Sequence, residues 1–325
     1  MSSIVAPEIG PGRARLIGIL CIVGAMVLFT VTDVSIKLLS GGYALHQIVL
    51  IRSLIGLVML LGLILPLRGG YAVLRTRRLQ LHALRGMLVV AANMLFFAAL
   101  AVMPLADAVA ISFVSPLAIT VLSVLLLKES VGPRRWAAIA IGLLGVIVVL
   151  RPGTEAFQPA ALLPFFGAIA YAFLNILTRK MGGTEQATTL TFYIQLSFIA
   201  VSLAMGLAVG DGRFAGAAGP AAEFLLRAWV WPAASDWPLL LVLGITSGIG
   251  SLLLSEAYRT CEAGMVAPFE YTAMPIAVVF GVLVFKEWPD PITWLGIVLI
   301  IGGGLYMLWR ETRARPLPQT PQARR

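Results

Sequence analysis

Long, almost uninterrupted apolar stretches dominate the chain, and short polar segments separate them. Ten stretches have lengths near those of membrane-spanning helices, and they lie at 16–38, 46–66, 83–103, 107–127, 135–151, 160–178, 188–209, 238–257, 264–285 and 291–309. A helix needs roughly 20 mostly apolar residues to cross ~30 Å of hydrocarbon. The stretches are continuously apolar, whereas the strands of a membrane β-barrel alternate in polarity. We therefore predict an all-α polytopic membrane protein with ten transmembrane helices.

Composition supports the same class of protein. Hydrophobic residues make up 59% of the 325 residues, charged residues only 12%, and the mean hydropathy is +0.95. Soluble domains carry about 25% charged residues. The first apolar stretch is longer than the core of a cleaved signal peptide, which has about 7–15 residues. We expect residues 1–15 and 310–325 to be short tails.

Basic residues are distributed unequally between the two predicted sides of the membrane. Of 24 Lys and Arg residues, eighteen fall on the side of the two termini. The opposite side carries five: Lys37, Arg151, Arg213, Arg227 and Lys286. Cytoplasmic loops are enriched in Lys and Arg, so both termini are expected in the cytoplasm. The net charge of +9 is then a topology signal that anionic lipid headgroups would reinforce, and no nucleic-acid partner is expected.

A sequence repeat links the fourth-to-fifth and the ninth-to-tenth stretches. "KESVGPRRWAAIAIGLLG" and "KEWPDPITWLGIVLIIGG" share K-E-x3-P-x2-W-x8-G. The five identities are all 158 residues apart, from Lys128 and Lys286 to Gly145 and Gly303. Earlier stretches match more faintly. Their equivalent positions are Asp33 with Asn175, Lys37 with Arg179, and Arg52 with Gln195.

Each half of the chain thus holds five predicted helices, an odd number, so the second half would enter the membrane from the opposite side. We predict two inverted five-helix repeats, at 16–151 and 160–309. Inverted repeats are a recurrent plan of secondary transporters, in which substrate binds near the midplane between the repeats.

The ten stretches, the duplicated K-E-x3-P-x2-W-x8-G motif and "TDVSIK", "LRGML" and "ISFVSPL" resemble the EamA family of the drug/metabolite transporter superfamily. The resemblance implies a bacterial inner-membrane carrier working by alternating access. Its substrate would be a small organic metabolite such as riboflavin, S-adenosylmethionine or an amino-acid-like solute. It also implies a central cavity lined by helices 1, 3, 4, 6, 8 and 9, with helices 5 and 10 at the periphery. Protons are a candidate coupling ion, and a homodimer is left open.

Ionisable residues inside apolar stretches are the first candidates for the site, because a charge at the bilayer centre costs about 2.5–3.5 kcal/mol on insertion scales. Asp33 and Arg52 lie at equal depth, about one and a half turns from the outer ends of neighbouring stretches. They could form an outer gate or substrate site, or a structural ion pair. Lys37, one turn from Asp33, could compete for its carboxylate or reach outward to water.

A second set of polar residues lies deeper or toward the cytoplasm. Its members are Asn93, Asn175, Gln195, Glu256, Glu270 and Tyr271. Glu270 could handle substrate or protons, whereas Glu256 could simply pair with Arg259 at the surface. Pro116 and Pro275 would each remove a backbone hydrogen bond and kink a helix, as a structural bend or as a gate.

Other motifs narrow the function. The K-E motif lies at helix ends. Its role there is either structural, in forming the helical hairpin and anchoring it in the membrane, or that of a gate. Motifs of nucleotide binding, nucleophilic hydrolysis and redox chemistry are absent, as is paired His, Cys or carboxylate spacing, so no enzyme activity, cofactor or metal is expected. A membrane-embedded enzyme or signalling protein without transport activity is the alternative to the transporter.

Overall fold

The computed structural model describes residues 11–67, 70–129, 132–152, 158–214, 216 and 219–313 of the chain. Within these ranges the regular elements are all helical. The main α-helices are α1 (Pro11–Leu39), α2 (Leu45–Met59), α4 (Leu79–Leu100), α5 (Leu105–Ser112), α6 (Val114–Leu127), α7 (Pro133–Leu150), α8 (Leu162–Met181), α9 (Ala187–Val209), α11 (Trp237–Thr260), α13 (Ala273–Phe280) and α14 (Pro291–Arg313).

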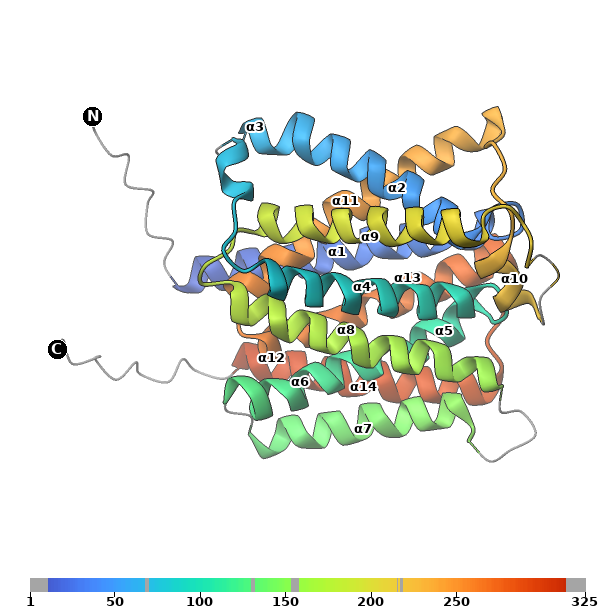
Figure 1. Cartoon of the computed structure of the whole chain (residues 1–325). Helices are drawn as coiled ribbons and strands as arrows, with labels where there is room; N and C mark the ends of the chain where they lie inside the picture. The colour runs from blue at the N-terminus through green and yellow to red at the C-terminus, as the bar shows by residue number, and fades with distance from the viewer. Residues whose placement is uncertain are drawn as a thin grey trace, which may run out of the picture.

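Short elements extend or connect these helices. They are η1 (Leu60–Ile64), α3 (Leu65–Leu67), η2 (Tyr71–Leu74), η3 (Pro159–Ala161), α10 (Pro220–Leu226), η4 (Ala234–Asp236), α12 (Ala263–Val266), η5 (Ala267–Thr272) and η6 (Gly281–Phe285). Figure 1 shows the long helices running roughly along one direction, with the beginning of α1 and the end of α14 at the same end of the bundle.

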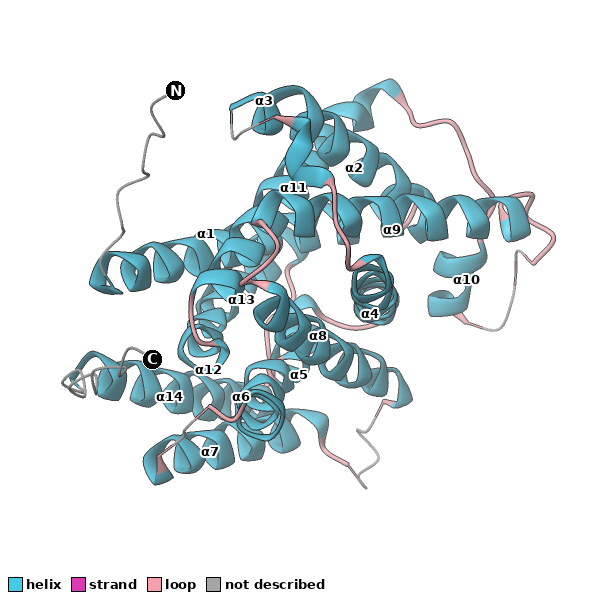
Figure 2. Cartoon of the chain, turned by 60° about the vertical axis from the view of Figure 1, so that its left-hand side comes forward, coloured by secondary structure: helices cyan, strands magenta, loops and turns pink. Residues whose placement is uncertain are grey.

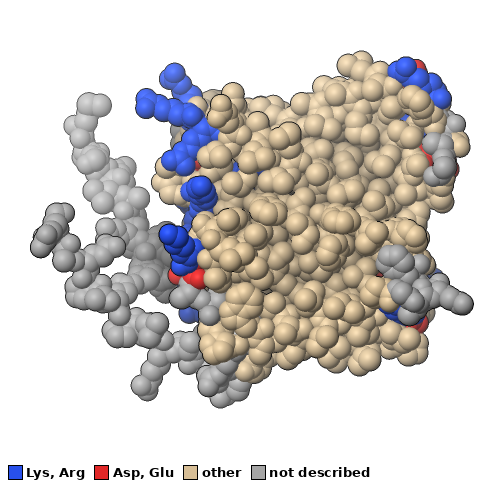
Figure 3. All heavy atoms as spheres, turned by 60° about the horizontal axis from the view of Figure 1, so that its bottom comes forward, with Lys and Arg blue, Asp and Glu red and all other residues tan. Residues whose placement is uncertain are grey.

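Eight helical stretches of the described residues are long and apolar enough to cross a membrane, which confirms a multi-pass membrane protein. They are Arg15–Leu39, Leu45–Leu67, Leu79–Leu100, Leu105–Leu127, Pro159–Met181, Ala187–Val209, Ala234–Thr260 and Ala267–Phe285. The other two predicted stretches also form helices, but their apolar parts, Trp136–Leu150 and Pro291–Gly303, are shorter. Figure 3 shows Lys and Arg gathered at the two ends, with a broad uncharged band between them. Such a band is what a hydrocarbon layer requires.

The helices pack in a pattern that stays the same when the two halves of the chain are exchanged. Helix α1 packs on α11 and α8 packs on α4; α2 packs on α11 and α9 on α4; α6 packs on α8 and α13 on α1. Two further pairs, α2 with α9 and α7 with α14, join equivalent helices. Figures 1 and 2 both show α7 beside α14 at one edge of the bundle and α2 at the opposite edge.

The predicted stretches at 107–127 and 264–285 are not single continuous helices. The first is interrupted at Phe113, whose ψ of 4° separates α5 from α6. The second passes through the 3₁₀ segment η5. Pro116 and Pro275 are each the third residue of the α-helix that resumes after the interruption. In the first turn of a helix the missing N–H of proline removes no regular helical hydrogen bond. Phe113 and Tyr271, which are 158 residues apart, meet at the two interruptions with ring centroids 5.1 Å apart.

Close backbone contact joins α7 to α14 through small residues. A Cβ added to Gly145 would lie 2.8 Å from the carbonyl oxygen of Gly296. A Cβ added to Gly303 would lie 3.0 Å from the carbonyl oxygen of Ala138. Ala138 lies 158 positions before Gly296, and Gly145 lies 158 positions before Gly303. The two contacts are therefore the same contact with the halves of the chain exchanged. Small residues allow such approach between membrane helices, so the glycines have a packing role.

We predict opposite effects for two glycine-to-alanine substitutions in this pair of helices. Gly145→Ala should lower the melting temperature of the detergent-solubilised protein, since its methyl group collides with backbone. Gly302→Ala has open space around the new Cβ. It should leave the melting temperature unchanged or raise it, because alanine stabilises a helix interior by roughly 0.5–1 kcal/mol over glycine. Equal melting temperatures for the two variants would contradict the packing described here.

Candidate functional site

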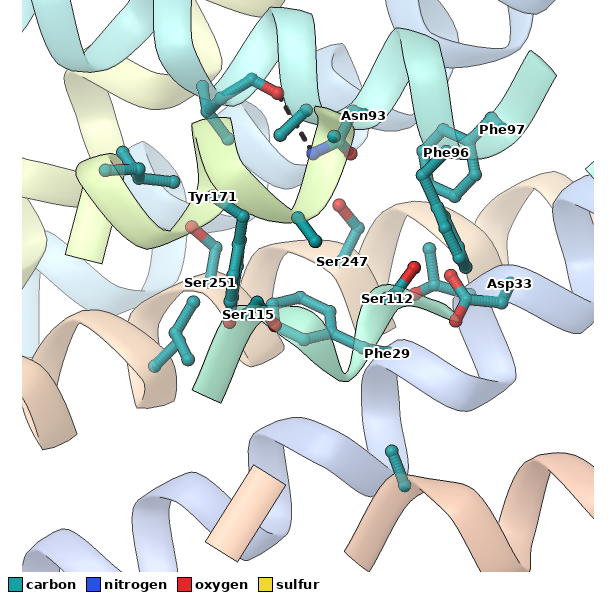
Figure 4. Close-up of a pocket in the computed structure, with 18 of the residues that line it drawn as sticks. Phe29, Asp33, Asn93, Phe96, Phe97, Ser112, Ser115, Tyr171, Ser247 and Ser251 are labelled. Carbon is teal, nitrogen blue, oxygen red and sulfur yellow. Dashed lines mark hydrogen bonds between the residues drawn. The ribbon is translucent and has the colours of Figure 1, made fainter. Parts of the chain in front are cut away.

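A cavity of about 200 Å³ lies inside the bundle. Its walls come from α1, α2, α4, α5, α6, α8, α9, α11, η5 and α13, with none of the described residues of α7 or α14 among them. The walls therefore include the six helices expected from the family resemblance and also the second and seventh spans. Aromatic rings and hydroxyl groups dominate the residues labelled in Figure 4, where Asp33 lies at one end of the group and Ser251 at the other.

Arg52 of α2 is the buried cation of this cavity, with only 2% of its surface exposed. Its Nη2 donates a hydrogen bond to Oδ1 of Asn93 at 2.9 Å. The guanidinium also lies over the rings of Phe97 and Phe198, at 5.1 and 4.8 Å from their centroids. Its Nε is buried without a hydrogen-bond partner. Arg52 is thus held in place by three cavity-lining side chains and retains a free donor.

Asp33 of α1 lines the same cavity as Arg52. The expected direct pair between the two is not formed: among the described residues, no ion pair within 4.0 Å joins them. The cause is the position of the guanidinium, which Asn93 and the two phenylalanine rings hold. Both side chains therefore line the cavity without a direct ion pair between them.

Glu270 of η5 is the buried carboxylate of the cavity, with 3% of its surface exposed. Its Oε1 accepts hydrogen bonds from the hydroxyl of Tyr258 at 2.5 Å and from that of Tyr171 at 3.3 Å. Its hydrogen-bond partners are thus tyrosine hydroxyls. Tyr258, which lies fully buried on α11, was not predicted as part of the site.

Gln195 of α9 also lines the cavity, next to α2. Only 1% of its surface is exposed, and its Nε2 has no hydrogen-bond partner. A buried amide donor without a partner costs about 1–3 kcal/mol. This nitrogen lies against Gly56 of α2. Arg52 and Gln195, which the faint repeat made equivalent, thus both line the cavity, and each has a buried nitrogen without a hydrogen-bond partner.

The other predicted site residues lie outside the cavity wall. Asn175 is buried on α8 and donates to the carbonyl oxygen of Tyr171 at 3.1 Å. Tyr271 lies behind Phe113. Glu256 pairs with Arg259 at 2.6 Å, as the surface interpretation expected. Lys37 pairs with Glu287 at 2.7 Å, so it neither competes for Asp33 nor extends freely to water.

Several cavity-lining hydroxyl groups were not predicted from the sequence. They belong to Thr30, Thr32, Ser112, Ser115, Ser247 and Ser251. Serine and threonine in apolar helices usually bond to backbone carbonyls of the preceding turn, so their presence alone does not indicate a site. Thr30 and Ser112 indeed donate to Met26 and Ala108 in that way.

Comparison with known proteins identifies the family. The model of the EamA-like transporter family matches residues 16–151 and again 158–309. The chain belongs to this family, which confirms the resemblance seen in its motifs. A crystal structure shares the fold, with a TM-score of 0.66 at 21% identity over 93% of this chain and 99% of that chain.

Curated relatives of the chain are named as transporters. An S-adenosylmethionine uptake transporter of Rickettsia prowazekii is 26% identical over 93% of this chain and 96% of its own length. A riboflavin transporter of Rhizobium johnstonii is 28% identical over 95% and 96%, respectively. A pseudopaline exporter of Pseudomonas aeruginosa is 25% identical over 87% and 93%.

We predict that removing the Tyr258 hydroxyl destabilises the protein more than removing that of Tyr171. Tyr258→Phe keeps the ring but removes the shorter bond to Glu270, and an unsatisfied buried partner costs about 1–3 kcal/mol or more when charged. Tyr171→Phe removes the longer bond and should cost less. Thermal unfolding of the purified variants in detergent measures the order. A larger loss for Tyr171→Phe would contradict this account of Glu270.

Proposed function

We propose that the chain is a secondary transporter that moves a small organic metabolite across the bacterial inner membrane by alternating access. The observation that carries this proposal is the cavity within the bundle, which the polar residues Arg52, Gln195, Asp33 and Glu270 line together. A water-soluble solute with both acceptor and cationic groups would be complementary to these polar side chains. The aromatic walls would stack on a flat ring.

Two classes of substrate fit these walls. S-adenosylmethionine carries a purine ring, a sulfonium cation and a zwitterionic amino acid, which match aromatic, carboxylate and arginine groups. Riboflavin carries a flat ring system with several acceptors and a hydroxylated chain, which match aromatic rings, amide donors and hydroxyls. Relatives of this chain are named for each of these solutes. An amino-acid-like solute would use the charged groups without the rings.

Ten spans in two inverted repeats, with both termini in the cytoplasm, are part of this proposal. The recurrence of the same contacts 158 residues apart supports the inverted repeats. The excess of Lys and Arg at the end where α1 begins supports the orientation (Figure 3). Residues 16–151 and 160–309 would be the two repeats, and α7 and α14 their peripheral fifth helices.

We predict that transport depends on the cavity residues and not on Glu256. Proteoliposomes holding the purified protein should exchange radiolabelled S-adenosylmethionine or riboflavin, measured in both directions. Arg52→Gln and Asp33→Asn should each lower the rate about tenfold or more, since a lost charged contact to substrate is equivalent to about 1.4 kcal/mol or more. Glu256→Gln, outside the cavity, should keep the rate. No movement of any solute in a broad metabolite panel would refute the transporter.

Proton coupling can be tested with the same vesicles. Glu270 is a buried carboxylate whose hydrogen-bond donors, Tyr258 and Tyr171, are neutral, so it is the candidate for carrying a proton. Glu270→Gln should abolish acceleration by an imposed pH gradient while preserving exchange without a gradient. Equal acceleration in both proteins would exclude Glu270 as the coupling group.

The ten-span topology makes a separate prediction for α7. If α7 crosses the membrane, a cysteine replacing Gly132 should react with an impermeant thiol reagent from the cytoplasmic side. A cysteine replacing Pro152 should react from the outside. Both positions are exposed at the two ends of α7. Reaction of both from one side would mean that α7 does not cross.

A further inference from the structure

Glu287, which follows η6 in the second half of the chain, forms hydrogen bonds with α1 and α5 at the end of the bundle where α1 ends. The Glu287 carboxylate accepts hydrogen bonds from Lys37 Nζ at 2.7 and 2.9 Å. The same carboxylate accepts the backbone N–H of Leu105, the first residue of α5, at 3.0 Å. Lys37 Nζ also donates to the carbonyl oxygen of Met103 at 3.0 Å. Glu287 therefore connects the second half to two helices of the first.

The opposite end of the bundle carries the same arrangement with the halves exchanged. Glu129 of the first half forms an ion pair with Arg179, at the end of α8, with Oε1 and Nε 3.6 Å apart. The same Oε1 accepts the backbone N–H of Ala263 at 3.4 Å. Glu129 therefore connects the first half to two elements of the second.

The correspondence between the two contacts extends to the backbone. Glu129 and Glu287 are 158 residues apart, and so are the two amides that they accept, Leu105 and Ala263. The preceding lysines, Lys128 and Lys286, both adopt left-handed φ angles of 57° and 60°.

This left-handed residue ends the helix and turns the chain back on itself. The Glu129 N–H then bonds to Ser123 O at 3.2 Å and the Glu287 N–H to Gly281 O at 3.0 Å. Such a turn points both carboxylates at the other half of the chain.

We propose that Glu287 and Glu129 are paired gating residues, the first closing the outer end of the cavity and the second closing the inner end. Each joins the fourth helix of one half to the first and fourth helices of the other, and these helices line the cavity. Opening one end must separate those helices and so break that contact, while the matching contact at the other end can remain. The inference rests on the proposed transport function and assigns residues to its two gates.

A nearby ion pair provides a matched control. Arg151 and Asp290 also join the two halves at the outer end, but they lie beside α7 and α14, whose described side chains take no part in the cavity wall. Hydrogen bonds from Arg151 lower the pKa of Asp290 to about 2, so the Asp290 carboxylate is ionised near neutral pH. Removing it should weaken the periphery without opening the cavity.

The test measures access to each end of the cavity, independently of any substrate. In protein with Cys21→Ala and Cys261→Ala, Ser112→Cys reports on the outer part of the cavity and Ser251→Cys on the inner part. Oriented vesicles are treated with an impermeant thiol reagent. Glu287→Gln, which keeps an oxygen for the Leu105 N–H, should raise labelling of Ser112→Cys from outside by about three- to tenfold. Glu129→Gln should do the same for Ser251→Cys from inside. A minor state populated at about 0.1–10% leaves room for such rises.

Three results would overturn the proposal: folded Glu287→Gln and Glu129→Gln proteins with unchanged labelling, a rise at the wrong end, or the same rise in Asp290→Asn. If Glu287→Gln does not fold, Lys37→Met breaks the same ion pair and carries the same expectation. The double variant Lys37→Met with Glu287→Gln should label like either single variant, because the two substitutions break the same Lys37–Glu287 ion pair. A labelling change without solute movement would support the two gates but refute the transport function. Solute movement without a labelling change would support the transport function but refute the gates.

Discussion

The free-energy cost of an unpaired polar group in hydrocarbon is the constraint on which this bundle depends. Continuous helices satisfy their own backbone, but the fourth span of each half is interrupted. Both interruptions lie at the bundle interior, where Phe113 packs against Tyr271. The first residue of α5 is satisfied by a carboxylate from the other half of the chain. Contacts between the two halves thus occur both at the interruptions and at the start of α5.

This constraint makes the shape of the bundle nearly symmetric while leaving its chemistry asymmetric. Helix contacts, glycine contacts and the two glutamate contacts all recur at equivalent positions. The charged groups of the cavity do not: Asp33 corresponds to the neutral Asn175, and Arg52 to Gln195. Under the proposed alternating access, such near-symmetric packing would let each end of the bundle adopt the arrangement of the other. The unequal side chains give the cavity a fixed polarity toward its ligand.

Much of the architecture could be predicted from the sequence, because hydrocarbon allows few solutions to a long apolar stretch. The repeat was visible because Lys128, Pro133 and Trp136 recur at identical spacing. The free-energy cost of a charged residue in hydrocarbon also pointed to Asp33, Arg52 and Glu270, because such residues within apolar stretches are candidates for a functional role. The interruption at Phe113 was not predicted, because the residues around it are as apolar as those of a continuous helix.

Partners distant in sequence were the hardest part of the site to predict. Helical periodicity places Lys37 beside Asp33, yet Lys37 bonds to Glu287, 250 residues away. Periodicity also cannot show that Tyr258 reaches Glu270, because a tyrosine on an apolar helix equally suits packing or the membrane interface. The hydroxyl-bearing side chains of the cavity carried no signal, since each could bond within its own helix.

The K-E motif combines a structural role with a role in the contact between halves. Its lysine takes a left-handed conformation that is unfavourable for a residue with a Cβ, by roughly 1–2 kcal/mol. A glycine at that position would end the helix without this strain. The lysine ends α6 or the η6 segment so that the following glutamate leaves the helix axis and reaches the opposite half. Helix termination and closure of the cavity therefore depend on the same two residues, at both ends of the bundle. A movement that frees either glutamate would also release a backbone amide of the facing span, so each end is expected to open as a unit and not by gradual loosening.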